Sequence, residues 1–92
     1  INVEDVLAKN TNVSLYPNPI SDESKIYFTL NSTYNVDLKI SDVTGRVLSR
    51  QNFGKLTGTQ SLKIGANTLT PGYYIAELRI GNETKSLPFT IK

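Results

Sequence analysis

Hydrophobic and polar residues alternate in short runs along most of the chain after residue 12. In the run "KIYFTL", Ile26, Phe28 and Leu30 fall on one face of an extended strand and the residues between them fall on the other. Residues typical of turns separate each run from the next. The pattern therefore predicts a series of short strands, each with one apolar face. Comparable runs occupy residues 36–41, 61–65, 72–81 and 85–92.

The spacing of these runs indicates the fold class. Strands that recur about every 8–12 residues, with no long segment of helical period, are typical of two antiparallel sheets packed face to face. We predict an all-β protein, an immunoglobulin-like antiparallel β-sandwich of about seven strands. The one helical hint, at residues 3–9, is too short to be stable alone in water. Residues 1–12 are interpreted as a linker or loosely attached arm, and residues 13–92 as one domain.

Two turns can be assigned in more detail. In "SDVTGR", Asp42 offers a side-chain acceptor and Gly45 follows three residues later, which predicts a hairpin with a glycine bulge. Arg46 then starts the return strand. In "LTPGYY", Gly72 follows a proline and Tyr74 lies early in a long strand. A tyrosine in this position is similar to the tyrosine corner of immunoglobulin-like domains, whose hydroxyl bonds to upstream backbone.

The segment Pro17-Asn18-Pro19 interrupts the chain between two apolar runs. Each proline lacks an N–H group and has a fixed φ, so the segment cannot lie inside a helix or a central strand. Leu15 and Tyr16, which precede it, are expected to enter the core. By itself the segment predicts a stiff turn at the start of the domain.

Composition narrows the chemistry that the chain can perform. Its 92 residues contain no cysteine and no histidine, which excludes disulfides and removes the commonest zinc ligand and general base. Ten Lys and Arg residues against eight Asp and Glu leave a net charge of +2, and these charges are mixed along the sequence. No basic block suited to nucleic acid or anionic lipid is present, and no apolar run approaches the length of a membrane span.

Candidate catalytic and metal sites are weak. The serines have only lysine or carboxylate side chains as candidate bases, and no G-x-S-x-G or S-x-x-K motif occurs. "SDES" at 21–24 and "SDV" at 41–43 could lend oxygen ligands to Ca²⁺, but neither forms a complete calcium-loop motif. We therefore predict no enzyme activity, no cofactor and no catalytic, cofactor-binding or metal-binding residue.

Five segments, in a fixed order, resemble a known family. They are "LYPNP" at 15–19, the strand at 25–30, "LKISDVTGRVL" at 38–48, "LTPGYYIAEL" at 69–78 and the lysine-containing terminal strand "KSLPFTIK" at 85–92. Together they resemble the type A C-terminal sorting domain of the type IX secretion system (the Por secretion system) of Bacteroidota. The resemblance covers residues 13–92.

This resemblance implies a secretion signal that is itself a folded domain. Its partner in the same chain would be an N-terminal cargo such as a protease, adhesin or glycosidase. The cargo would reach the periplasm by an N-terminal Sec signal, and the type IX outer-membrane translocon would recognise the domain and export the cargo to the cell surface or the medium. A sortase of the cysteine-peptidase type would then remove the domain by a cut in or before residues 1–13.

The resemblance also indicates a surface to be recognised, formed by the hairpin at 42–46, the turn at 69–74 and the last strand. Pro88 places that strand at a sheet edge or a bulge. Removal of residues 89–92 is expected to abolish export and to leave most of the sandwich folded. The suspected recognition and structural residues are Pro17, Asn18, Pro19, Asp42, Gly45, Arg46, Gly72, Tyr74, Lys85, Ile91 and Lys92.

Two other functions fit a β-sandwich without catalytic residues. One is an accessory module of a surface protein that binds carbohydrate or protein, with outward tyrosines such as Tyr27 and Tyr73 as its platform. The other is an immunoglobulin-like spacer in a cell-surface protein. A sorting domain must end the full-length chain, whereas spacers and binding modules can occur anywhere.

Overall fold

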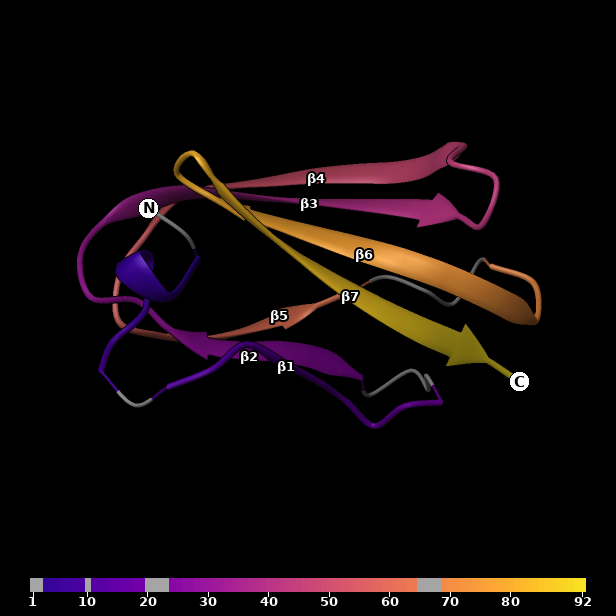
Figure 1. The fold of residues 1–92 in the computed structure, drawn as a ribbon, viewed down its shortest axis with the longest axis horizontal. Helices are drawn as coiled ribbons and strands as arrows, with labels where there is room; N and C mark the ends of the chain where they lie inside the picture. Colours follow the sequence, from indigo (N-terminus) through magenta and orange to yellow (C-terminus); the bar gives the residue numbers. More distant parts are fainter. Residues whose placement is uncertain (1–2, 10, 20–23, 65–68) are drawn as a thin grey trace.

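The computed structural model describes residues 3–9, 11–19, 24–64 and 69–92, and these form two antiparallel sheets packed face to face (Figure 1). The predicted all-β sandwich of about seven strands is confirmed. A short 3₁₀ helix, η1, precedes the strands. The elements are η1 (Val3–Val6), β1 (Ser14–Tyr16), β2 (Lys25–Thr29), β3 (Tyr34–Asp42), β4 (Val47–Leu56), β5 (Thr59–Lys63), β6 (Gly72–Ile80) and β7 (Glu83–Ile91).

The strands divide into a sheet of three, in the order β1-β2-β5, and a sheet of four, in the order β4-β3-β6-β7. Every strand pair is antiparallel. The chain passes from the first sheet to the second between β2 and β3, returns for β5, and crosses again to β6. As a result β7 is an edge strand, and it lies in front of β6 in the view of Figure 1. The prediction that Pro88 lies on an edge strand is confirmed.

The core lies between the two sheets and follows the alternation in the sequence. In β2 the predicted inward residues Ile26 and Phe28 are buried, and in β6 Ala76, Leu78 and Ile80 are buried. Partly buried apolar residues such as Leu15 pack around this core. In β2 and β6 the sequence pattern therefore predicts correctly which face of the strand is buried. The buried hydrophobic residues are Val6, Leu7, Ile26, Phe28, Leu30, Val36, Leu38, Ile40, Leu62, Ile64, Tyr74, Ala76, Leu78, Ile80 and Phe89.

The N-terminal segment differs from the expected loosely attached arm. Val6 and Leu7 are buried in the core, and Leu7 forms a β-bridge with Leu30. The side-chain amide of Asn31 donates to the carbonyl oxygens of Asp5 (2.7 Å) and Leu7 (3.2 Å). Two buried apolar side chains and these backbone contacts attach residues 5–9 to the sandwich, which a short helical pattern in the sequence does not reveal.

Tyr16 also differs from its prediction. Its side chain is 56 % exposed, and its ring stacks on Tyr27 with centroids 4.6 Å apart. Tyr16 stands opposite Lys25, which the sequence pattern places on the outward face of β2. Because directly opposite residues share a face, Tyr16 points outward. Leu15, its neighbour, packs against the core as predicted.

Strand β4 extends into "FGKLTGT" at 53–59, a segment whose glycines and threonines are typical of a turn. The strand continues to Leu56, and its pairing with β3 shifts register at Val36/Asp37, where Val36 faces Gly54 and Asp37 faces Asn52. Gly54 has a φ of 73°. A bulge of this kind breaks the alternation of apolar and polar residues, so periodicity alone does not detect this strand.

Candidate recognition site at the terminal end of the sandwich

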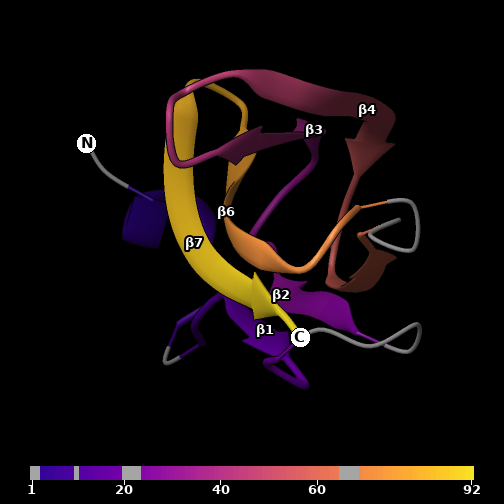
Figure 2. The ribbon, with the colours of Figure 1, turned by 90° about the vertical axis from the view of Figure 1, so that its right-hand side faces the viewer.

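Most of the suspected residues converge on one end of the sandwich, which we call the terminal end. It consists of the β3–β4 hairpin, the start of β6, the end of β7 and the turn at 17–19. In the view of Figure 2 this end faces the reader. Asp42, at the end of β3, stands opposite Tyr74 in β6, and Tyr74 stands opposite Phe89 in β7. Gly72 stands opposite Ile91. Strand pairing therefore brings together residues from widely separated parts of the sequence.

The hairpin at 42–46 has the predicted construction. The N–H of Gly45 donates to the carbonyl oxygen of Asp42 (3.1 Å), and Gly45 has a φ of 90°. Oδ1 of Asp42 accepts from the N–H of Thr44 (2.9 Å), from the hydroxyl of Thr44 (2.6 Å) and from the N–H of Arg46 (3.1 Å). Oδ2 lies 3.3 Å from Nε of Arg46. One carboxylate thus organises the whole turn.

The contacts of Asp42 make hairpin stability depend on pH. The hydrogen bond from the Thr44 hydroxyl, together with backbone N–H groups and Arg46, lowers the pKa of Asp42 below its ordinary value of 3.8. A lowered pKa in the folded state contributes stability above the ordinary value, and this contribution is lost as pH falls through the lowered one. We expect Asp42→Asn to melt below the wild type at pH 7, and the difference to vanish well below pH 3.8. Thermal melts across this range measure the effect, and a constant difference would contradict it.

Gly45 provides a test of the backbone of the same hairpin. Its positive φ disfavours side chains, although a Cβ built there meets no atom within 4 Å. We expect Gly45→Val to lower the free energy of unfolding by about 1–3 kcal/mol through backbone strain alone. Gly45→Asn, whose side chain tolerates the left-handed region, should cost less. Chemical denaturation of the two variants measures this order, and equal stabilities would refute the assignment.

The predicted tyrosine corner is confirmed at Tyr74. Its side chain is buried, and its hydroxyl donates to the carbonyl oxygen of Thr70 at 2.5 Å. Its ring stacks on Phe89, with centroids 5.6 Å apart. Phe89 is itself only 2 % exposed. The corner therefore anchors the turn before β6 and supports the last strand at the same time.

The Pro17–Pro19 turn contacts the last strand directly. Oδ1 of Asn18 accepts a hydrogen bond from the N–H of Thr90 (3.2 Å), across 72 residues of sequence. The hydroxyl of Ser24 donates to the carbonyl oxygen of Pro17 (2.7 Å) and so fixes the turn from its other side. The two prolines predict the turn but not this contact, because nothing in the sequence indicates which distant N–H group Asn18 meets.

Pro88 fits this edge because of the alternation along β7. The N–H of Thr90 points away from β6, toward Asn18. Successive residues of a strand alternate, so the nitrogen of Pro88 also faces the open edge and no hydrogen bond to β6 is lost. The pairing of β7 with β6 runs from Glu83 to Ile91 without a register shift. The outer edge of β7 thus lacks a donor at Pro88, and its donor at Thr90 is already bonded.

The two lysines of the suspected set differ in their position. Lys85 stands opposite Leu78 in the first half of β7, away from the terminal end. Lys92 follows the last residue of β7 and is exposed at the terminal end. The structure therefore separates Lys85 from the other suspected residues.

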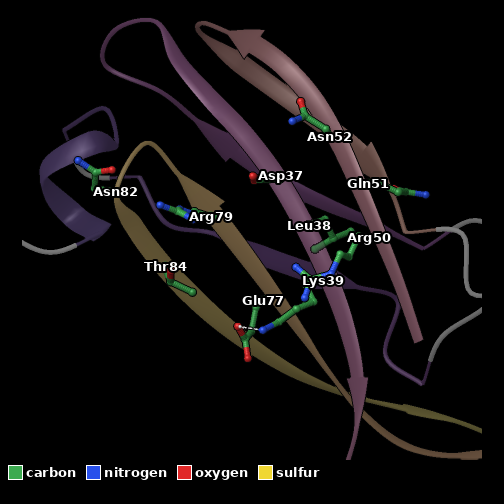
Figure 3. A pocket seen from close by; sticks show the side chains of 10 residues that line it. All are labelled: Asp37, Leu38, Lys39, Arg50, Gln51, Asn52, Glu77, Arg79, Asn82 and Thr84. Carbon is green, nitrogen blue, oxygen red and sulfur yellow. Dashed lines mark ion pairs between the residues drawn. The ribbon is translucent and has the colours of Figure 1, made fainter. Parts of the chain in front are cut away.

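A hollow of about 600 Å³ lies over the outer face of the four-stranded sheet (Figure 3). Charged side chains of both signs line it. Within it, Nζ of Lys39 lies 3.2 Å from Oε2 of Glu77, and Arg79 stands opposite Asp37. The hollow is a polar surface of the sheet that contains one cross-strand ion pair, Lys39 with Glu77.

The described residues contain no group of three or more metal-ligating side chains, and no helix among them has the length and apolar character to cross a membrane. Most of the "SDES" segment suggested for Ca²⁺, at 21–23, lies outside the described residues. Asp42, in the second suggested segment, has its carboxylate engaged by Thr44 and Arg46.

The protein is a small β-sandwich domain in which most of the suspected recognition residues lie at the terminal end. Residues 14–92 match the family described as the secretion system C-terminal sorting domain, and the chain belongs to this family. It is a C-terminal secretion signal for type IX export, as the resemblance predicted, and this role implies export to the cell surface or secretion. No curated protein and no solved structure matches the chain.

Proposed function

We propose that the outer-membrane translocon of the type IX system recognises the terminal end of this domain and exports the cargo attached to it. Membership of the family implies a type IX system and an N-terminal cargo in the same chain. The observation that carries the finer proposal is the hydrogen bond between Asn18 and Thr90. It links the first motif of the domain to its last strand, beside Tyr74 and the 42–46 hairpin.

The remaining steps of this proposal concern the route of the cargo. The cargo crosses the inner membrane by a Sec signal and passes through the periplasm, and a sortase of the cysteine-peptidase type removes the domain at the surface. Proteases cut exposed, flexible segments. Val6 and Leu7 are buried in the sandwich. We therefore propose that the cut falls before residue 5.

A ligand-binding module has less support. The platform suggested for it required Tyr27 and Tyr73 to lie on one face. Tyr27 belongs to the three-stranded sheet, where it stacks on Tyr16, and Tyr73 belongs to the four-stranded sheet. Both point away from the core, so the two rings lie on opposite sides of the sandwich and form no common platform.

Reporter export tests the proposal. A periplasmic reporter fused ahead of the 92-residue chain is expected to reach the surface or the medium of a host that has a type IX system. The same fusion should remain in the periplasm when the translocon gene is deleted, as should the reporter alone in either host. Retention of the fusion in the intact host would refute translocon recognition. Export without the translocon would assign it to another route.

A further inference from the structure

The outer face of the four-stranded sheet carries an apolar row at the terminal end. Val47 stands opposite Ser41, Ser41 opposite Ile75, and Ile75 opposite Pro88. Directly opposite residues share a face of the sheet. The neighbours of Ile75 in sequence are buried in the core, so Ile75 lies on the outer face, as does the row across it, although Ser41 within the row is only 6 % exposed. Tyr73, two residues before Ile75, lies on the same face.

Several apolar side chains on and beside this row are unusually accessible, whereas Ile75 is only partly exposed. Tyr73 is 71 % exposed and Val47 is 38 % exposed. Val43, in the adjoining hairpin, is 71 % exposed. Among the described residues, Tyr16 is the one other large apolar residue with an exposed side chain. Exposed apolar side chains that gather in one place mark sites of protein–protein contact.

The next outward row of the same sheet is charged. Arg50 stands opposite Lys39, and Lys39 stands opposite Glu77. Glu77 forms its ion pair with Lys39, which leaves Arg50 beside a like charge across the strands. Like charges directly opposite each other are unfavourable. The apolar row is therefore bordered on this side by a positive site that an acidic group would stabilise.

The edge of the sheet next to the row is unsuited to strand addition. Pro88 provides no donor, and the N–H of Thr90 is bonded to Asn18. A partner beside the C-terminal half of β7 therefore binds side chains on the outer face and not the strand edge. A second copy of the chain would bring two positive borders and two chains of net charge +2 together. A partner with acidic groups meets no such repulsion.

We propose that the export machinery docks on a surface of this domain formed by Tyr73, Val47, Ile75 and Pro88. The matching surface of the partner is apolar and is bordered by acidic groups. This inference rests on the proposed recognition of the terminal end by the translocon. The inference specifies that the partner binds the outer face of the four-stranded sheet. It also excludes a partner strand that pairs with the main chain along the C-terminal half of β7. Tyr73 is the expected anchor, because aromatic residues dominate the binding energy of interfaces.

Photo-crosslinking in a type IX host tests the contact directly. A benzoyl-phenylalanine placed at Tyr73 is expected to crosslink the reporter fusion to an outer-membrane component of the export system. The same group at Tyr16, an exposed tyrosine on the opposite sheet, serves as the matched control and should not crosslink. Equal adducts from both positions, or an adduct from Tyr16 alone, would overturn the proposal.

Substitutions on the same surface provide a second readout. We expect Tyr73→Ser combined with Val47→Thr to lower export of the reporter by about ten-fold or more, as for other interface anchors. Tyr16→Ser should leave export within about two-fold, as should Thr84→Ser at the far end of the sheet. Melting curves establish that each variant is folded. If the wild-type fusion is exported and the folded double variant is exported equally well, the docking surface is wrong and translocon recognition stands. If the wild-type fusion is not exported, the proposed function itself fails.

The oligomeric state tests whether a second copy of the chain, instead of the export machinery, occupies this surface. Analytical ultracentrifugation of the purified chain is expected to show a monomer, both for the wild type and for the Tyr73→Ser, Val47→Thr variant. A wild-type dimer that the double variant disperses would assign the surface to a second copy and would overturn the proposal.

Discussion

Replacement of Phe89 by alanine is expected to lower the free energy of unfolding by about 3–5 kcal/mol, the range for a buried aromatic side chain. Phe89 is 2 % exposed and stacks on Tyr74, so the variant loses core volume and the support of the tyrosine corner together. For a domain of this size each kcal/mol corresponds to about 4–8 °C in melting temperature. A thermal melt of Phe89→Ala against the wild type measures the effect.

Leu87 provides the matched control in the same strand. It packs against the core but is only partly buried. Leu87→Ala should therefore destabilise the domain less than Phe89→Ala does. Equal melting temperatures for the wild type and Phe89→Ala would show that the last strand is not docked on the core as the structure has it.

The burial of Phe89 corrects an expectation drawn from the sequence. Removal of residues 89–92 was expected to leave most of the sandwich folded, but it removes a core side chain. Loss of export by that truncation would report unfolding as well as loss of a recognised surface. A shorter truncation, which keeps Phe89 and Thr90, separates the two effects.

Substitution of Asn18 by alanine is expected to expose the terminal strand to solvent exchange. The N–H of Thr90 lies on the outer edge of β7, where Asn18 is its acceptor. Without that acceptor we expect its hydrogen exchange to accelerate by about ten-fold or more, toward the rate of an unprotected edge amide. Amide exchange followed by NMR at Thr90 gives this result, with the inward-facing amide of Phe89 as an internal reference.

Asn18→Asp is the control for this experiment, because aspartate keeps an acceptor oxygen in the same place. Its Thr90 amide should remain close to wild-type protection, whereas that of Asn18→Ala should not. If alanine leaves the exchange of Thr90 unchanged, Asn18 does not hold the terminal strand, and the link between the first and last motifs is absent in solution.

Features that depend on residues close together in the sequence were predicted correctly, whereas features that depend on distant residues were not. Strand faces such as that of Ile26 and Phe28 depend on a local period of two, and the 42–46 hairpin depends on Asp42 and Gly45 alone. These features were predicted. The pattern did not reveal most of β4, because Phe53 is an extra residue between the paired Asn52 and Gly54 and breaks the period of two. Tyr16 was misassigned because its face depends on which strand it pairs with.

The arrangement of the candidate site was harder to predict from the sequence, because it also depends on contacts between distant residues. The residues of the terminal end were mostly named, and the family resemblance located its hairpin and turn. Their convergence depends on pairs such as Gly72 with Ile91, and on the contact of Asn18 with Thr90. The docking of Val6 and Leu7 likewise depends on a distant partner, Leu30. Local sequence patterns do not indicate which of many such distant pairings occurs.

The central claim is that a folded terminal end is the export signal, and removal of Ile91 and Lys92 alone tests it most directly. Ile91 is partly buried and pairs with Gly72, so its loss should cost only about 1–2 kcal/mol of stability. The measurement is surface and medium reporter activity from the truncated fusion, beside a melting curve of the truncated chain. We predict a folded domain whose cargo stays in the periplasm. Wild-type export by the folded, truncated chain would contradict the claim.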